Sequence, residues 1–521
     1  MAGPGLFGGV FAHGGADTGD QAWLTAMLHT EAALARALER ARLAPAGAGA
    51  AVTAAAIAGA AGAIDAADLG RQAALTGNPV PALVRALTRS VPPELAAAVH
   101  QGATSQDIID TAAMLLARRA LAAAASDLAA AADTAAALAA QHRDTLMIGR
   151  TLLQQAVPVT FGLVAAGWLT GLDEARADLD RVRSERLAVQ FGGAAGTLAS
   201  LGVDGPRVAA LLAEEIGLPL PVLPWHTDRL RIVEVAAACA AAAAALGKIA
   251  RDVTLLAQSE VAEAREGAAG DMGDGGGEPA DGEERPEAEE RPEREERPGG
   301  EERPEREERP GGEERVGGEE PGDGGGPAGS TRRGGSSAMP HKRNPVAAVA
   351  ILGCTRQVPG LLATLTAAAE QEHQRAAGAW HSEWEPFAGL LRLTASAASW
   401  GAELLAGLTV DAARMRANLD AAGGFPLAER VAGLLAPAMG AVAAHDLVAR
   451  ASAAAAATGR QPRAELLDDP ELRGRLESAG VTPAQAEAAL DPASYLGAAG
   501  AFTDAALAAH RTAALAHPRD G

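Results

Sequence analysis

The residue types best able to do chemistry gather in residues 334–345, which read GGSSAMPHKRNP. Two hydroxyls, an ammonium, a guanidinium and an amide lie within nine consecutive residues. The paired glycines permit positive φ angles, and the prolines restrict the backbone around the charged side chains. The apolar run that follows Pro345 predicts a helix, whose N-terminus favours negatively charged groups. We therefore expect a cationic loop that binds an anionic substrate.

The ammonium of this loop is unusual for the chain. Lys248 and Lys342 are the only lysines among 45 basic residues, so arginine is used almost everywhere else. An ammonium is a compact point charge, whereas a guanidinium is a planar fork. Lys342 is therefore a candidate for stabilising negative charge that develops during a reaction.

Two further polar segments interrupt the helical patterns. Residues 100–107 read HQGATSQD and precede an apolar helical run, so Thr104, Ser105 or Asp107 could cap a helix. The same hydroxyls and amides could instead bind an anion. Residues 149–158 read GRTLLQQAVP and add a guanidinium, a hydroxyl and two amides.

These segments together resemble a known family. Residues 334–345 match the GSSxMPxKxNP signature of the fumarase/aspartase superfamily, and the chain resembles the bacterial 3-carboxy-cis,cis-muconate cycloisomerases over nearly its whole length. The resemblance implies that Ser336 is the catalytic base, with its alkoxide stabilised by Lys342, by nearby amides and by exclusion of water. It further implies a set of substrate-binding residues: Thr104, Ser105, Gln106, Arg150, Thr151, Gln154, Ser337, Met339, Arg343 and Asn344.

One position departs from much of the superfamily. Fumarases, argininosuccinate lyases and adenylosuccinate lyases have G-x-T-H-x-Q or close to it in the second segment, but Leu152 stands here in place of that histidine. The departure argues against those three lyases and leaves the proton donor unassigned by motif. His142 is our candidate donor, with His373 and His381 as alternatives, although a lone histidine near a helix end is more often structural.

The resemblance implies a specific reaction. One carboxylate of 3-carboxy-cis,cis-muconate would add to a double bond and the neighbouring α-carbon would take a proton, giving a carboxymuconolactone in aromatic-acid catabolism. No cofactor or metal is expected. The expected partners are a small polycarboxylate substrate and further copies of the chain in a homotetramer, with neither nucleic acid nor membrane. Two alternatives stay open: a fumarate-releasing lyase such as adenylosuccinate lyase, and a non-catalytic helical tetramer.

The elements that must position these segments are helices. Leucine and alanine recur at three- and four-residue steps through most of the chain, and no strand pattern of any length is present. We predict an all-α, L-aspartase/fumarase-like fold, with domains at 1–98, 99–408 and 409–521. The resemblance supplies a central bundle of long helices that assembles into a tetramer whose active sites are shared between subunits.

Composition and charge indicate the character of the remaining segments and the cellular compartment. Residues 271–330 hold 22 acidic and 8 basic residues, including the repeated EERPEREERPGG, and so account for most of the net charge of −21. We predict a disordered acidic insertion at about 271–327, passive in folding and catalysis, with a regulatory role as the alternative. The apolar run 235–247 is too short to span a bilayer, and no secretory signal is visible, so we expect a cytoplasmic protein. Cys239 and Cys354 fit small core hydrophobes in a reducing compartment.

Overall fold

The structure is a computed structural model that describes residues 6–14, 17–267, 339, 342–422, 425–458 and 467–516. The predicted acidic insertion at 271–327 lies outside these residues. So do Ser336 and Ser337.

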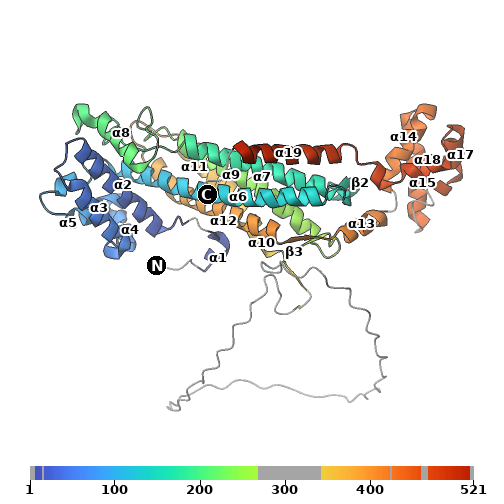
Figure 1. The fold of residues 1–521 in the computed structure, drawn as a ribbon, viewed down its shortest axis with the longest axis horizontal. Coiled ribbons are helices and arrows are strands. Elements are labelled where there is room, and N and C mark those ends of the chain that lie inside the picture. The colour runs from blue at the N-terminus through green and yellow to red at the C-terminus, as the bar shows by residue number, and fades with distance from the viewer. Residues whose placement is uncertain are drawn as a thin grey trace, which may run out of the picture.

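Long helices form an elongated bundle that confirms the predicted all-α class (Figure 1). Alanine-rich sequences favour helix and allow close helix–helix approach, so the bundle is long and narrow. Its members pack α6 against α7 and α12, and α9 against α7, α10, α11 and α12. They are α6 (Ser105–Gln141), α7 (Phe161–Glu185), α9 (Leu230–Leu256), α10 (Val346–Thr355), α11 (Val358–Ala368) and α12 (Ala379–Ala406).

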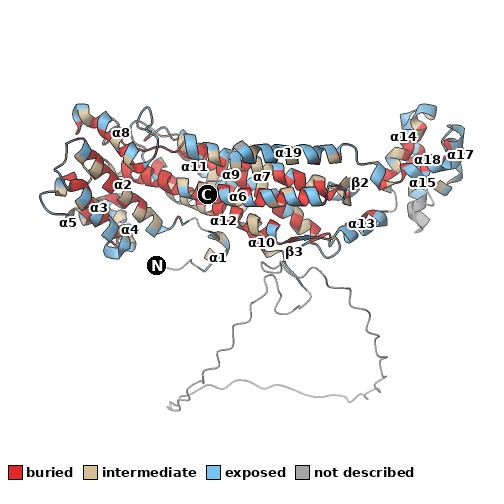
Figure 2. Ribbon diagram, viewed as in Figure 1, coloured by how far each residue is buried: buried red, intermediate tan, exposed pale blue. Residues whose placement is uncertain are grey.

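Shorter helices cover one end of the bundle, where α2 packs on α3, α6 and α8. The buried residues form one continuous apolar core that runs from Leu24 in α2 to Met415, as the buried positions in Figure 2 show. The predicted boundary at residue 98 stays a prediction. The helices at this end are α1 (Gly8–Phe11), α2 (Asp20–Arg40), α3 (Ala48–Ala58), α4 (Ala66–Thr76), α5 (Val80–Arg89) and α8 (Gly205–Ile216).

At the other end, the C-terminal helices build a separate small core around Leu427, Leu435 and Leu447. The last helix then returns to pack along α7 and α6. Because α19 joins the bundle, the small core ends before it. The small core is built by α14 (Ala428–Met439), α15 (Ala441–Thr458), α17 (Pro470–Ser478) and α18 (Pro483–Ala489), whereas α13 (Ala412–Ala421) and α19 (Ala499–Ala516) lie outside it.

Two small antiparallel sheets correct the expectation that the chain has no strands. β1 (Leu146–Thr151) pairs with β2 (Gln154–Thr160), and β3 (Ala264–Glu266) pairs with β4 (Leu408–Val410). The first pair is a hairpin with a two-residue turn. Strands this short, interrupted by Gly149 and Pro158, do not produce a clear alternating pattern in the sequence.

Helix hydropathy also corrects the argument from residues 235–247. In the described part of the chain, Leu230–Leu256 and Val346–Ala368 are long and apolar enough to cross a membrane, and the bent pair formed by 48–63 and 66–76 could count as a third, by length and composition only. Half of the apolar window in α9 is buried against its neighbours in the bundle, so packing accounts for its hydropathy. Only 33% of the window in 346–368 is buried, which leaves an apolar face uncovered.

Candidate active site

The first polar segment forms the N-terminus of α6. Thr104 is the N-cap residue, and the carboxylate of Asp107 accepts a hydrogen bond from its backbone N–H at 3.0 Å. This is the capping arrangement that the sequence allowed, and it satisfies one of the amides that a helix start leaves unpaired. The side chains of Thr104 and Ser105 remain half-buried at this helix end.

Gln106 was predicted to bind substrate, and the structure gives it a different position. The residue is only 2% exposed. Its Nε2 donates to Asp110 Oδ2 at 3.1 Å and to the His226 carbonyl at 2.9 Å, while its Oε1 accepts from Arg375 Nη1 at 2.6 Å. Because the amide is already satisfied within the protein, Gln106 holds neighbouring segments together and does not face a ligand.

Asp107 makes a junction between three segments. Its Oδ1 accepts hydrogen bonds from Gly192 N at 3.0 Å and from the imidazole of His226 at 2.6 Å, and its Oδ2 also accepts from Gly193 N at 3.0 Å. A side chain at Gly192 would place its Cβ 2.6 Å from the His226 ring, so the close approach requires glycine. The turn that contains Gly192 and Gly193 is therefore a partner of the α6 N-terminus.

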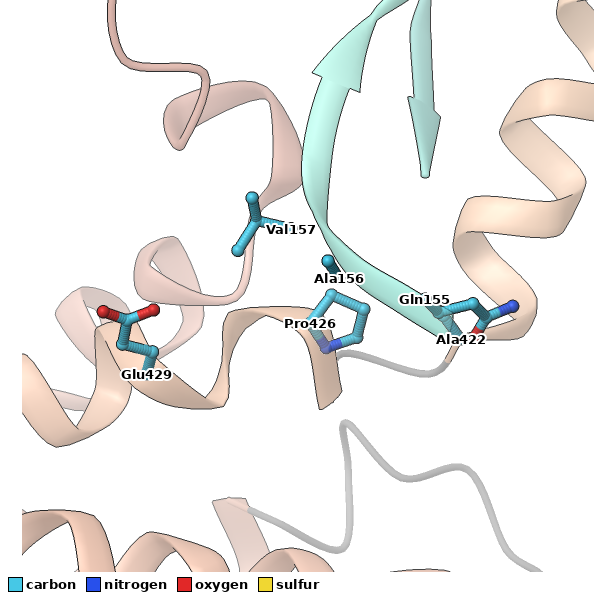
Figure 3. Close-up of a pocket in the computed structure, with 6 residues that line it drawn as sticks. All are labelled: Gln155, Ala156, Val157, Ala422, Pro426 and Glu429. Atoms are coloured by element: carbon cyan, nitrogen blue, oxygen red, sulfur yellow. The ribbon is translucent and has the colours of Figure 1, made fainter. Parts of the chain in front are cut away.

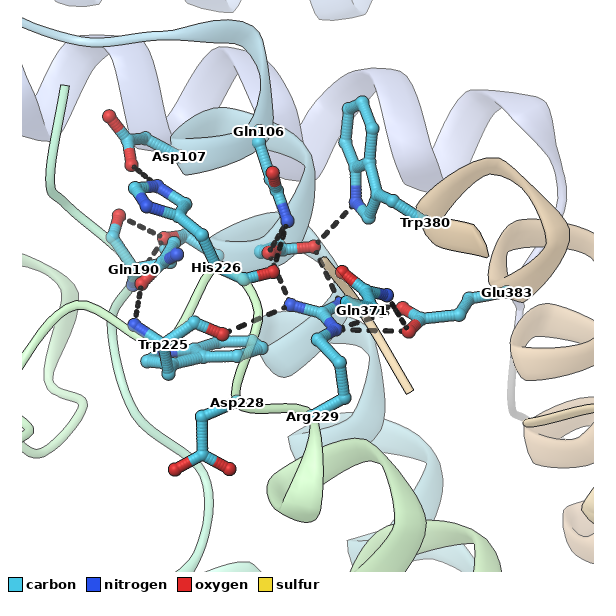
Figure 4. Close-up of polar contacts among 12 residues, drawn as sticks. Gln106, Asp107, Gln190, Trp225, His226, Asp228, Arg229, Gln371, Trp380 and Glu383 are labelled. Carbon is cyan, nitrogen blue, oxygen red and sulfur yellow. Dashed lines mark hydrogen bonds and ion pairs between the residues drawn. The ribbon is translucent and has the colours of Figure 1, made fainter. Parts of the chain in front are cut away.

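A buried ion cluster lies one turn further along α6 (Figure 4). Arg229 bridges two carboxylates, with 2.7 Å from its Nη1 to Asp110 Oδ2 and 2.6 Å from its Nη2 to Glu383 Oε2. The indole of Trp380 donates to Asp110 at 3.0 Å. Burial raises the pKa of Glu383, and Arg229 acts in the opposite direction. The density of charged and aromatic residues near 372–385 signalled this region, but nothing in the sequence paired it with Asp110.

The second segment is the β1–β2 hairpin, with Thr151 paired to Gln154 beside its tip. Leu152 and Leu153 form the turn with φ angles of 50° and 65°, and they are 96% and 71% exposed. Left-handed conformations disfavour side chains with a Cβ, so this turn is strained as well as apolar. Thr151 and Gln154 are exposed beside it.

Arg150 forms an ion pair within the chain. Its guanidinium makes a bidentate ion pair with Glu263, at 2.8 and 2.6 Å, and Glu263 is fully buried. Asn418 donates to the same carboxylate at 2.8 Å. Since its charge is already neutralised, Arg150 is not the free cation that the sequence predicted for substrate.

Of the third segment, the structure describes Met339 and residues 342–345. Met339, Lys342, Arg343 and Asn344 are exposed, and Pro345 is half-buried. Lys342 N donates to the Met339 carbonyl at 3.0 Å, which makes a turn. At the start of α10, both carboxylate oxygens of Glu266 lie 3.0 Å from Ala347 N. The helix N-terminus expected to attract an anion thus holds a carboxylate of the chain itself.

His142 occupies the C-cap of α6 and is buried. Its Nδ1 lies 3.1 Å from Thr145 Oγ1, and its ring meets Phe161 edge to face at 5.4 Å. Burial lowers the pKa of His142, which favours the neutral ring. Its contacts fit a structural histidine, and its role as proton donor stays a prediction. The alternative donors His373 and His381 are both exposed.

The first and second segments do not meet within one chain. Thr104 precedes α6 and the hairpin follows it, so 37 helical residues separate them, a length of roughly 55 Å at 1.5 Å per residue (Figure 1). A cavity of about 340 Å³ beside the hairpin is lined by Gln155, Ala156, Val157, Ala422, Pro426 and Glu429 (Figure 3). A larger one of about 1190 Å³ lies between the N-terminal helices and α12. Neither is lined by residues from two of the three segments.

Comparison with known proteins extends these observations. The lyase family matches residues 20–271, and the adenylosuccinate lyase C-terminus matches residues 424–506. The 3-carboxy-cis,cis-muconate cycloisomerase of Bradyrhizobium diazoefficiens is 42% identical over 93% of each chain, and the nitrosuccinate lyase of Streptomyces davaonensis is 41% identical over 95% of this chain and 93% of that one. The crystal structure of the 3-carboxy-cis,cis-muconate lactonizing enzyme from Pseudomonas putida superposes with a TM-score of 0.77 at 36% identity, covering 98% of this chain and 99% of that one. The chain therefore belongs to the fumarase/aspartase superfamily of lyases, together with the 3-carboxy-cis,cis-muconate cycloisomerases.

Proposed function

We propose that the protein is a cycloisomerase that closes 3-carboxy-cis,cis-muconate to a carboxymuconolactone. The observation that carries the proposal is likeness to two relatives that bear this name, at 42% identity over 93% of this chain and at 40% identity over 94% of it. Leu152, which replaces the histidine of other superfamily lyases, supports it independently. The substrate would be a small polycarboxylate made during breakdown of aromatic acids.

In the proposed mechanism, the chain's residues stabilise charge beside a carboxylate. Proton exchange at an α-carbon passes through an aci-carboxylate, and each well-placed donor contributes about 3–4 kcal/mol to its stabilisation. Lys342 and Asn344 provide a cation and an amide for that charge, and Ser336 moves the proton. Thr104, Ser105, Thr151 and Gln154 hold the remaining carboxylates, together with Ser337, Met339 and Arg343.

The site is proposed to form between copies of the chain in a homotetramer. Two observations support this. The first two segments stand at opposite ends of α6, and the apolar face of 346–368 is covered over only a third of its window. Val349, which lies on that face, is 56% exposed. Light scattering coupled to gel filtration tests the assembly, since a monomer that retains full turnover would contradict a shared site.

The nitrosuccinate lyase of Streptomyces davaonensis supports a second candidate, because it is 41% identical over 95% of this chain. Elimination from a nitrosuccinate also begins with removal of a proton beside a carboxylate, so the same serine, lysine and amide would serve. An adenylosuccinate lyase is less favoured, since Leu152 replaces the histidine and the C-terminal match covers only 424–506.

The deciding experiment is an absorbance assay of the purified protein with 3-carboxy-cis,cis-muconate, run in parallel with nitrosuccinate and adenylosuccinate. We expect turnover of the muconate to exceed that of the other two by orders of magnitude. Preference for nitrosuccinate would establish the second candidate. No turnover of any of the three would favour a non-catalytic role.

Ser336→Ala tests the proposed base in the same assay. We expect a loss of at least about 10³-fold in kcat, because no other group of comparable position would exchange the proton with the α-carbon, giving it in the lactonising direction and accepting it in the reverse. Assembly should be unchanged by gel filtration. Full activity in this variant would remove Ser336 as the base.

A further inference from the structure

Glu31 is a charged residue that the proposed mechanism does not use. It lies in the middle of α2 with no exposed surface. Its Oε1 is 2.6 Å from Nδ1 of His100, whereas its Oε2 is enclosed and has no hydrogen-bond partner among the described residues. A buried carboxylate is costly unless it is paired and hydrogen-bonded. The bond to His100 is thus the principal compensation for burying this charge.

His100 stands at the head of the segment that leads into Thr104 and Ser105. Its φ angle is 59°, in the left-handed region, which is unfavourable for a residue with a Cβ. The Ala103 N–H donates to its carbonyl at 3.2 Å, which closes a turn. Such a conformation persists only where surrounding contacts impose it.

Packing fixes the other side of the same turn. Gly102 has a φ of 80°, and a Cβ there would lie 2.7 Å from Leu201. Its carbonyl is pressed against Gly193, where a Cβ would be 2.9 Å away. The turn is therefore held by contacts on one side and by the Glu31–His100 bond on the other, and a small shift at His100 moves Thr104.

Two carboxylates act on the imidazole, Glu31 from α2 and Asp107 from α6. Residues 192–201, which pack against the turn, contain no charged side chain. Burial lowers the pKa of His100, but the hydrogen bond and charge of Glu31 and the charge of Asp107 outweigh it and raise the pKa above its ordinary value of about 6.5. The environment thus favours the imidazolium.

We propose that Glu31 and His100 form a latch that positions Thr104 and Ser105, and that the latch holds while the imidazole carries its proton. Glu31 and His100 are positioning residues here, since they act through the turn. A histidine whose pKa is raised on folding contributes stability that is fully present below the unfolded value and is lost as pH rises through the folded value. Turnover should therefore fall on the alkaline side as the latch releases.

The test rests on the proposed cycloisomerase activity and compares pH profiles of kcat/KM for 3-carboxy-cis,cis-muconate from about pH 6 to about pH 10. In His100→Gln we expect the alkaline fall to disappear and the low-pH value to drop on the order of 10-fold, mainly through a higher KM, because a misplaced binding segment weakens substrate alignment. In Glu31→Gln the alkaline fall should move to lower pH. His29→Gln, a half-buried histidine on the same helix, is the control and should keep the parent profile.

A purely structural role for His100 would lower kcat/KM by one factor at every pH and would leave the alkaline fall in place, and that result overturns the latch. Thermal unfolding tests it without substrate. The difference in Tm between the parent and His100→Gln should be present near neutral pH and vanish at alkaline pH. If the Tm difference between the parent and His100→Gln depends on pH in this way but the parent does not turn over the muconate, the proposed function fails and the latch stands. A difference that is constant with pH overturns the latch whatever the substrate.

Discussion

The two ends of α6 differ in how much of their structure the chain supplies by itself. At the N-terminal end, Asp107, Asp110 and Arg229 are buried and saturated with hydrogen bonds from three other segments. At the other end, the hairpin tip carries Leu152 and Leu153 exposed in strained conformations. A buried network whose hydrogen bonds are all made needs no further partner, whereas an exposed apolar turn favours contact with another chain. The buried network at the first end is complete within the chain, whereas the exposed hairpin tip at the second end is a surface that the proposed homotetramer would cover.

The largest effect on stability should come from disrupting the buried ion cluster at the N-terminal end of α6. Arg229→Met leaves Asp110 and Glu383 buried without their shared cation, which should lower the free energy of unfolding by about 3–5 kcal/mol. Chemical denaturation measures the change. Arg40→Met is the control, because Arg40 pairs with Glu214 and Glu215 at the surface and should change stability by less than about 1 kcal/mol. Equal losses of unfolding free energy in the two variants would show that the buried cluster stabilises the fold no more than a surface ion pair does.

Arg150→Met tests whether the base of the hairpin is also structural. The substitution leaves Glu263 buried with Asn418 as its remaining side-chain donor, and we expect a loss of about 2–3 kcal/mol in unfolding free energy. KM should stay near the parent value at temperatures where the variant is folded. A large rise in KM with unchanged stability would return Arg150 to the substrate site.

A substitution at the hairpin tip should raise stability and lower activity. Replacing Leu152 and Leu153 with Asn and Gly supplies the residues that a two-residue turn with positive φ angles prefers, and should stabilise the folded chain by about 1 kcal/mol. If the leucines contact a neighbouring subunit near its substrate, turnover or assembly should fall despite the gain. Thermal melts and gel filtration, run with the assay, separate the two effects. Higher stability with unchanged assembly and turnover would mean that the tip is solvent-facing in the working enzyme.

The smallest effect concerns the junction between α6 and the hairpin. Burial lowers the pKa of His142, so its contribution to stability is present above its ordinary pKa of about 6.5 and is lost as pH falls through the lowered value. The parent should therefore lose more Tm between neutral and mildly acidic pH than His142→Gln does. The same loss in both would show that protonation of His142 costs the folded state nothing.

The sequence was sufficient for the helical class, because leucine and alanine repeat at helical spacing over long stretches. It was not sufficient for the hairpin, since strands of six and seven residues give too little alternation to detect. The signature in 334–345 identified the lysine and asparagine as candidates. The partners that tie Asp107 and Asp110 to other segments, however, lie 85 or more residues away in the chain. Spacing cannot reveal such pairings. For the same reason Arg150 looked like a free cation until its contact with Glu263 was seen.

The bond between Glu266 and Ala347 has a consequence for how this chain can be modified. These residues are 81 positions apart, and the carboxylate lies 3.0 Å from the amide. The end of β3 and the start of α10 therefore lie side by side in the structure. Lengthening a closed loop adds only about 0.6 kcal/mol per doubling. This junction is therefore a natural place to graft a reporter or an affinity sequence without disturbing the helices on either side.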